Sequence, residues 1–423
     1  MTTARTLSTS EVATVQTRTV GTLMASQTLG GVGVASGLAV GALIAADVGG
    51  SDAVSGLATT TQVLGGALFT IPIAALMATR GRRVGLSAAY LIGAVGAVLA
   101  ITASVIASFA LLLLGTLCFG AATTANSQAR YAAVDLAAPS RRGRQLSLVV
   151  WATTVGAVLG PNLLGPGAAI SGVLGIPTLA GAWVISTIGF GLALVVLQAA
   201  LRPDPLLTAR ALEESAHGTA PEKGSGSVRR GASVIAHNPT ALLGTIAVAG
   251  GHVVMVSIMV MTPLHMSHGS AAIEVIGLVI SLHILGMYGL APVSGYLTDR
   301  LGAVSVVLIG VALLLLACAL AGISAAGASW SLTAGLVVLG LGWSCTMVAG
   351  SSLIAASVDV RQRSGVQGAS DVAMGLSAAA AGGLAGLVVD VFGYGWLCAF
   401  AALGALALGF YAATSRGVVS LAQ

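Results

Sequence analysis

The sequence predicts an all-α membrane protein with 12 transmembrane helices, and three observations support this fold class. Hydrophobic residues make up 56% of the 423 positions and charged residues only 7%. The mean hydropathy of +0.99 lies far outside the range of soluble proteins. The apolar runs repeat at about 20 to 27 residues, which is the length of a helix that crosses a hydrocarbon core of about 30 Å, and none of them alternates as a strand does.

The predicted spans divide into two sets of six, joined by a polar linker that is rich in Gly, Pro and Ser and is expected to be partly helical. The spans lie at about 20–46, 54–78, 84–107, 109–136, 146–168, 178–201, 240–265, 272–297, 303–325, 331–357, 366–391 and 394–414. The resulting regions are an N-terminal tail (1–19), a six-helix bundle (20–201), the linker (202–239), a second six-helix bundle (240–414) and a C-terminal tail (415–423). The first tail lacks the apolar core of a signal peptide, so span 1 is expected to be retained.

The distribution of Lys and Arg predicts the orientation in the bilayer. With a cytoplasmic N-terminus, all 18 of these residues fall in cytoplasmic segments, as the positive-inside rule requires. We therefore expect a multi-pass protein of the cytoplasmic membrane, with both termini and the linker in the cytoplasm. As a separate expectation, the protein is a monomer. The net charge of +5 then reflects topology and not nucleic-acid binding, because the cations are dispersed over short loops. No nucleotide-binding loop or catalytic triad is recognisable, so no enzyme activity is predicted.

Two blocks of sequence recur between the halves, which indicates a duplication. AAVD, ending at Asp135, parallels ASVD, ending at Asp359, and each closes the fourth span of its half. Likewise, RGRRVG (80–85) after span 2 parallels GYLTDRLG (295–302) after span 8. Two six-span halves in parallel repeat are an arrangement found among secondary transporters.

The loop after span 8 carries the more specific signal. It resembles the GxLxDRxG motif of the major facilitator superfamily through Gly295, Leu297, Asp299, Arg300 and Gly302. The resemblance covers the whole chain and implies the major facilitator fold and transport by alternating access. In the first half, Ala78 stands where the motif has its acidic residue, so a latch from that residue to a helix dipole is not expected there.

Charged groups inside a membrane are costly and usually functional. Arg130 lies toward the cytoplasmic end of span 4, and Asp371 lies at the start of span 11, at the same depth. Because spans 4 and 11 approach each other in this fold when the cytoplasmic side closes, we predict that Arg130 and Asp371 form a gate pair. The alternative is that each group reaches interfacial water by itself.

Potential soft-metal ligands concentrate between residues 252 and 287, which hold four of the 6 His and five of the 10 Met. Span 7 carries the pair Met255 and Met259, and span 8 carries the pair His283 and Met287. A spacing of four places both members of a pair on one side of a helix. We expect spans 7 and 8 to be antiparallel neighbours, so that the pairs descend together from the outer mouth to the midplane. Possible additional ligands are His252, His265 and Met266.

Thioether sulfur and neutral imidazole form a soft ligand set that suits Cu(I), whereas Mg²⁺ or Ca²⁺ would require carboxylates. MxxxM followed by HxxxM on adjacent spans also resembles the CcoA-type copper importers of the major facilitator superfamily, in which these motifs bind copper. The resemblance implies copper uptake into the cytoplasm through Met255, Met259, His283 and Met287. Copper would then be the substrate, and no resident cofactor is expected. The competing interpretation of the methionines is simple core packing.

An organic-solute carrier on the same fold is the alternative function. It would import a vitamin such as riboflavin, as related transporters of that subfamily do, or export drugs or metabolites with proton coupling. Gly156, Gly160 and Pro161 (GAVLGP) resemble the GxxxGP element of exporters, although helix packing with a proline kink explains them equally well. The cavity candidates for an organic solute are Gln27, Asn126, Gln128, Tyr131, Trp151 and Asn162.

Overall fold

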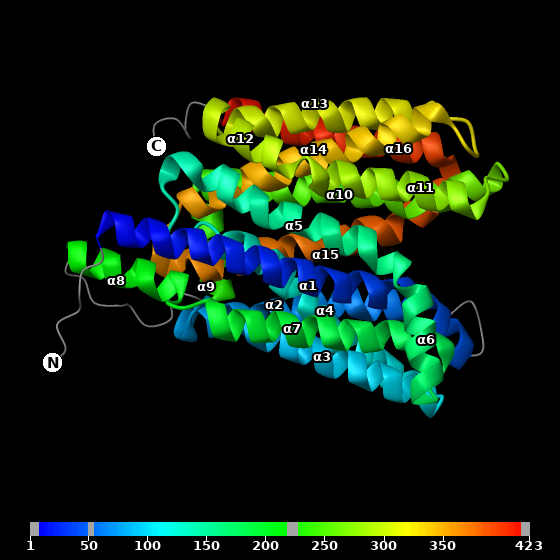
Figure 1. Cartoon of the computed structure of the whole chain (residues 1–423). Coiled ribbons are helices and arrows are strands. Elements are labelled where there is room, and N and C mark those ends of the chain that lie inside the picture. The colour runs from blue at the N-terminus through cyan, green and yellow to red at the C-terminus, as the bar shows by residue number, and fades with distance from the viewer. Residues whose placement is uncertain (1–7, 50–54, 218–226, 416–423) are drawn as a thin grey trace. The chain divides into compact units, whose positions relative to one another are not determined.

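The computed structural model describes residues 8–49, 55–217 and 227–415, which form helices and connecting turns with no strand in those ranges (Figure 1). By length and composition, 10 of the helices can cross a membrane, and two bent helix pairs raise the number to as many as 12. The all-α class predicted from the sequence is therefore confirmed. The helices divide into two compact units, which are described separately below.

Unit 1 comprises Met1–Ala138, Val155–Ala232 and Asp359–Val372. Within it, α3 packs on α4 and α7, α1 packs on α7, and α2 packs on α4. Glycines permit this close packing, since a Cβ on Gly96 of α3 would collide with the backbone of α4. The helices of this unit are α1 (Thr9–Gly49), α2 (Ser55–Arg80), α3 (Arg82–Val105), α4 (Phe109–Ala132), α6 (Leu164–Leu174), η3 (Thr178–Ala180), α7 (Gly181–Ala200), α8 (Pro205–His217) and α9 (Val228–His237).

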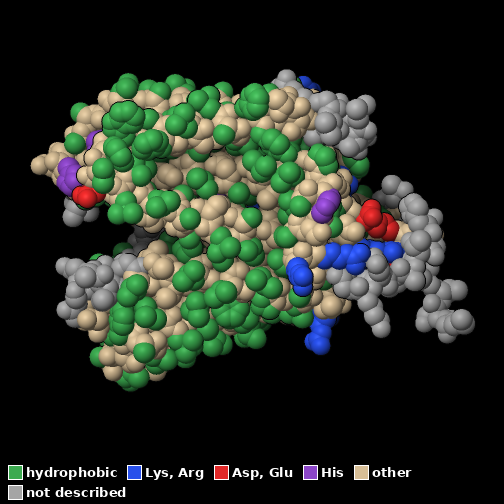
Figure 2. All heavy atoms as spheres, turned by 180° about the vertical axis from the view of Figure 1, so that it is seen from behind, with side chains coloured by type: hydrophobic (Ala, Val, Ile, Leu, Met, Phe, Trp, Pro, Cys, Tyr) green, Lys and Arg blue, Asp and Glu red, His purple; other side chains and the backbone are tan. Residues whose placement is uncertain are grey.

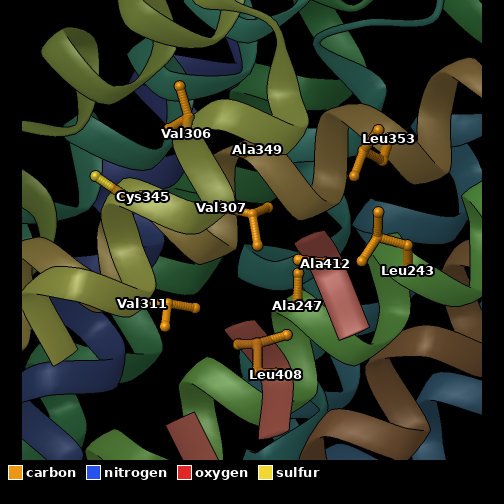
Figure 3. Close-up of a cluster of buried hydrophobic side chains, with 10 residues drawn as sticks. All are labelled: Leu243, Ala247, Val306, Val307, Val311, Cys345, Ala349, Leu353, Leu408 and Ala412. Carbon is orange, nitrogen blue, oxygen red and sulfur yellow. The ribbon is translucent and has the colours of Figure 1, made fainter. Parts of the chain in front are cut away.

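Unit 2 comprises Pro139–Thr154, Ser233–Val358 and Ala373–Gln423. Its core contains small and branched apolar side chains from α10, α13, α14 and α16, ten of which are drawn in Figure 3. One span consists of α11, the π-helical turn η4 and α12 in succession. The helices are η2 (Pro139–Arg141), α10 (Pro239–His268), α11 (Ile273–Ile284), η4 (Leu285–Gly289), α12 (Ala291–Leu301), α13 (Ala303–Gly322), α14 (Trp330–Ala356) and α16 (Tyr394–Thr414).

Three helices contribute to both units. One is α9, with residues 228–232 in unit 1 and 233–237 in unit 2. The first part of α5 (Arg142–Asn162) belongs to unit 2 and its last turns to unit 1. For α15 (Val360–Phe392) the order is reversed, with residues 360–372 in unit 1 and the remainder in unit 2. Helix α15 also begins before the predicted start of span 11, so Asp371 lies in its interior and not at its first turn.

The helix ends correct the sequence prediction in two further places. Helix α1 starts at Thr9, inside the expected tail, because Ser8 and Glu11 form a reciprocal capping box: the Glu11 carboxylate accepts from the Ser8 N–H at 2.7 Å. Predicted span 5 is not one straight helix, since α5 and α6 meet at a bend of 62°. Pro166 has no N–H to donate to the carbonyl of Asn162, so the α5 ladder ends there.

The exposed surface is suited to lipid. Large apolar side chains on the helix flanks are exposed, including Leu403 at 60% and Phe410 at 74%. On the face shown in Figure 2, hydrophobic side chains cover the flanks of the helices, and charged groups occur near helix ends. These observations, together with the apolar helices, describe a multi-pass membrane protein.

Candidate functional site

His283 is held in a defined tautomer. It is 1% exposed, and its Nδ1 lies 2.7 Å from the carbonyl oxygen of Leu336 on α14. Because a carbonyl can only accept, Nδ1 carries the hydrogen. Nε2 is buried and has no hydrogen-bond partner. A neutral imidazole that donates one N–H to a backbone carbonyl presents the lone pair of its other nitrogen, as metal-binding histidines do.

The four predicted metal ligands lie on helices that do not form a packed pair within the described residues. Met255 and Met287 are buried and Met259 is half-buried. However, α10 packs against α14 and α16, whereas α11 and η4 pack along α14. The expectation that spans 7 and 8 are facing neighbours was therefore wrong. Glycine on both η4 and α14 allows their backbones to approach closely, which favours this pairing. Ligand binding by these side chains stays a prediction.

His252 takes part in a different arrangement from the one predicted. Trp343 of α14 donates its indole N–H to His252 Nδ1 at 2.9 Å. Tyr288 of η4 packs edge-on against the same indole, with ring centroids 5.4 Å apart. We call these three residues the ring cluster. It joins α10, η4 and α14 near the middle of each span, and Nδ1 of His252 is already engaged there.

His265 and Met266 pack near the C-terminal end of α10. The His265 ring stacks on Tyr394 with centroids 4.1 Å apart, and its Nε2 lies 3.2 Å from the Ser324 hydroxyl. Met266 is completely buried. Among the described residues, no three His, Cys, Asp or Glu side chains gather closely enough to hold a metal ion. A metal path through unit 2 would therefore depend on methionine sulfur.

A buried ion network lies within unit 1, where the start of α3, the end of α4 and the first turns of α15 meet. The guanidinium of Arg82 binds both carboxylate oxygens of Asp135, at 2.8 and 3.2 Å. It also donates to Gln367 Oε1 at 2.6 Å and to Gln128 Oε1 at 3.3 Å. The side chains of Arg82 and Asp135 are both 0% exposed. Buried charges of this kind are stable only when paired and hydrogen-bonded, as they are here.

The predicted partners Arg130 and Asp371 are in contact within this network. They form an ion pair, with side chains 6% and 3% exposed. Gln128 links this pair to Arg82, because its Nε2 donates to Asp371 Oδ2 at 2.7 Å. The Arg130 guanidinium also lies 4.5 Å from the centre of the Tyr131 ring. The function of the pair as a gate stays a prediction.

The loop motif of the second half forms a latch to a helix start inside unit 2. Asp299 accepts from the backbone N–H groups of Gly143 and Arg144, at 2.8 and 2.9 Å. These groups lie in the first turn of α5, where N–H groups have no partner in their own helix. Arg300 does not join the latch but packs on the Tyr296 ring, 5.0 Å from its centre. Gly302 has a φ of 83°, which favours glycine.

The six cavity candidates do not form one group. Gln27 donates to the carbonyl of Asn126 at 3.3 Å, and the Asn126 side chain accepts from Tyr90 at 2.9 Å. Gln128 and Tyr131 belong to the ion network instead of a cavity wall. Trp151 and Asn162 are exposed, and Asn162 donates to its own helix.

Known proteins share this combination of membrane helices and repeated loop motifs. The sequence profile of the Major Facilitator Superfamily matches residues 20–274 and 252–418. The chain belongs to the major facilitator superfamily. As a member of this family it is a transporter that moves a small solute across a membrane.

The relatives identify the family but do not identify the substrate of this chain. The chain is 37% identical over 377 residues to an uncharacterised MFS-type transporter, YddS of Bacillus subtilis (strain 168), covering 88% of this chain and 85% of the relative. It is 25% identical over 383 residues to the riboflavin transporter RfnT of Brucella anthropi, covering 90% of this chain and 92% of RfnT.

Solved structures match the fold at low identity. The proton:xylose symporter XylE has a TM-score of 0.74 at 12% identity, covering 94% of this chain and 95% of XylE. The human organic anion transporter MFSD10 has a TM-score of 0.71 at 17% identity, covering 94% and 99% of the two chains. These likenesses establish the major facilitator fold.

Sequence reasoning missed the partners that complete both sites. Gln367 and Trp343 were not singled out, and Arg82 was noted only as part of the loop motif, because each meets its partner across a large sequence separation. The repeat AAVD pointed to Asp135 without giving it a partner. The sequence did contain a signal for the ion pair: Arg82 precedes span 3 and Asp135 ends span 4, so both lie at the same end of neighbouring helices.

Proposed function

We propose that the chain is a secondary-active carrier of the cytoplasmic membrane, with both termini in the cytoplasm, and that its substrate is a small organic solute with a planar ring. The ring cluster of His252, Tyr288 and Trp343 carries this proposal. Aromatic side chains are scarce in this chain, at 4% of residues, yet two of them and an imidazole meet near the middle of three spans. Carriers of this type bind their substrates near the midplane.

The cluster combines a fixed ring with two reachable ones. Trp343 is 4% exposed and holds the His252 ring through a hydrogen bond. His252 and Tyr288 are half-buried, so they are the two members of the cluster that we propose contact the solute. Planar unsaturated solutes stack on such rings. Tyr288 lies in the π-helical turn η4, and π-turns within helices often occur at functional sites. The 25% identity to a riboflavin transporter supports the same substrate class.

Uptake of radiolabelled riboflavin and of other planar solutes, in cells that express the chain, tests this proposal. Tyr288→Ala is expected to lower uptake about tenfold, since one aromatic contact contributes up to about 1.5 kcal/mol. Tyr296→Ala is the matched control because Tyr296 is 47% exposed on α12, and it should leave uptake unchanged. Equal uptake by the two variants, or no uptake of any planar solute above the background of cells without the chain, would refute the assignment.

Cu(I) is the second candidate substrate, and the unpaired Nε2 of His283 favours it. Met255, Met259 and Met287 would supply thioether sulfur, a soft ligand that suits Cu(I). Copper accumulation should fall to background in His283→Ala and strongly in Met259→Ala. His268→Ala, which removes an exposed histidine from the end of the same helix α10 as Met259, is the control. If His283→Ala and Met259→Ala accumulated as much copper as the parent, copper transport through these ligands would be refuted.

The Arg130 and Asp371 pair is the cytoplasmic gate in this proposal. It joins the end of α4 to α15 while the cytoplasmic side is closed, and it separates when that side opens. Asp371→Asn keeps the side-chain volume and removes the charge. This variant should bind substrate yet transport it poorly, which a comparison of equilibrium binding with uptake would detect. Unchanged uptake would show that the pair has no gating function.

A further inference from the structure

The helix α8 of the linker packs against the start of α15 within unit 1. Leu206 and Ala209 of α8 are buried in one apolar cluster with Val360, the first residue of α15. Arg210 donates from Nη1 to the carbonyl oxygen of Ala78 at the end of α2. Its Nη2 lies 3.5 Å from the carbonyl oxygen of Arg361 in the first turn of α15. One side chain thus connects the cytoplasmic ends of α2 and α15.

Asp204 fixes the position of α8. Its Oδ2 accepts from the backbone N–H of Arg83 at 2.7 Å, at the start of α3. Its Oδ1 accepts from Leu206 and Leu207 at 3.1 and 3.2 Å, which caps α8 itself. A Cβ on Gly81 would meet this carboxylate. Asp204 therefore anchors α8 to the loop between α2 and α3.

From this geometry we propose that α8 is the cytoplasmic latch of the first half and that Arg210 is its positioning residue. In the second half, Asp299 joins its own loop directly to a helix start. In the first half, Ala78 offers no carboxylate, and Arg210 contacts its backbone carbonyl instead. The linker helix supplies the connection that the loop cannot make. This inference does not depend on which solute is carried.

The contacts of α8 are of two kinds: those that would persist if α15 moved away, and those that would be lost. Asp204 and Arg83 both lie in the first half of the sequence, so their bond persists when α15 moves. The contacts of Leu206 and Ala209 with Val360, and of Arg210 with Arg361, are lost if the start of α15 leaves unit 1. Glu214 adds a weak pair, 4.0 Å from the Arg361 guanidinium and 42% exposed.

The start of α15 is only partly held by its own side chains. Three buried polar atoms on this segment have no hydrogen-bond partner, namely Ser364 Oγ, Gln367 Nε2 and Ser370 Oγ. A buried face with unpaired polar groups costs less to separate than a fully paired one. Contacts from α8 therefore contribute to keeping this segment in place.

A cysteine reporter on α15 tests the proposal. Ser364 is completely buried, so Ser364→Cys becomes reachable from the cytoplasmic side only when the start of α15 moves away. Inside-out membrane vesicles carrying the full chain would be treated with a membrane-impermeant maleimide, and the rate of reporter labelling measured. Vesicles without the reporter give the background from the native cysteines.

Arg210→Ala should raise the labelling rate about tenfold, which corresponds to the loss of one hydrogen bond to a charged group. Arg210→Lys keeps the charge but cannot reach both carbonyls, so an intermediate rate is expected. Arg202→Ala is the matched control, since exposed Arg202 donates within its own segment to the Gln198 carbonyl. Equal rates for the parent, Arg210→Ala and Arg210→Lys would overturn the proposal, and Asp371→Asn, which removes a second contact of the same segment, should raise the rate as well. Riboflavin or copper uptake plays no part in this readout.

Discussion

The connection after α2 and the connection after α12 hold corresponding positions in the two halves. They differ in which residues bind the N–H groups at a neighbouring helix start. Each precedes a helix through a glycine of positive φ, Gly81 at 88° and Gly302 at 83°. In the last turn of α12, Asp299 itself binds the start of another helix, α5. After α2, the acidic position is Ala78, and the linker supplies both a carboxylate, Asp204, and a guanidinium, Arg210.

This difference shows that the fold requires a hydrogen-bond acceptor at each helix start, because the N–H groups there have no partner in their own helix. The segment that supplies the acceptor differs between the halves: the linker in the first and the end of α12 in the second. Unit 1 carries an additional buried network around Arg82, to which α15 contributes Gln367, and unit 2 has no buried ion pair of this kind among the described residues. We therefore expect the halves to respond unequally to matched substitutions.

The largest expected effect is that of Arg82→Ala. It leaves the Asp135 carboxylate buried and without its main partner, which costs about 3–5 kcal/mol of stability. The free energy of unfolding in detergent, measured with denaturant, should fall by this amount. Arg300→Ala is the matched control in the second half. If both variants unfolded at the same denaturant concentration, the proposed asymmetry between the halves would be wrong.

The two glycines give the next largest effect. Gly302→Ala introduces backbone strain alone, because an added Cβ meets nothing within 4 Å, and should cost about 1–2 kcal/mol. Gly81→Ala adds a collision with the Asp204 carboxylate, so it should cost about 1 kcal/mol more. Thermal unfolding of the two variants would measure the difference. A lower melting temperature for Gly302→Ala would contradict the anchoring role of Asp204.

The two carboxylates should be nearly equivalent. Asp204→Asn and Asp299→Asn each remove a negative charge from a helix start and should cost about 1 kcal/mol. Because the two sites share no partner residue, the double variant should show the sum of the single effects. Denaturant unfolding of the four proteins in this cycle checks both statements, and a coupling above about 0.5 kcal/mol would show that the latches depend on each other.

The smallest effect is expected for Arg300→Ala itself. Its guanidinium packs on the half-exposed Tyr296 ring and is not part of the Asp299 latch. An exposed contact of this kind contributes about 0.5 kcal/mol. The unfolding midpoint should therefore barely change. A loss as large as that of Asp299→Asn would mean that Arg300 supports the latch.

Much of the fold could be predicted from the sequence because it depends on local patterns. Apolar run lengths predicted the spans, and the loop motif placed Asp299 where the structure shows it contacting a helix start. The equal depth of Arg130 and Asp371 correctly predicted their contact. The early start of α1 was missed even though Ser8 and Glu11 form a recognisable capping pattern.

The remaining features could not be predicted because they depend on packing. MxxxM and HxxxM each describe one helix, and neither contains information on which helix lies next to it. Small residues on η4 and α14 decided that neighbour instead. The ring cluster and the contacts of Arg210 arise between residues that are distant in sequence, so no local pattern indicates them.

Helix α15 has a mechanical consequence. It is a single unbroken helix from Val360 to Phe392, about 50 Å long, and its two parts belong to different units. A rod of this kind cannot shift at one end alone. If its first turns part from Arg130 and α8 as proposed above, the rest of the helix would be displaced with them. The movement would then be carried by the helix backbone itself.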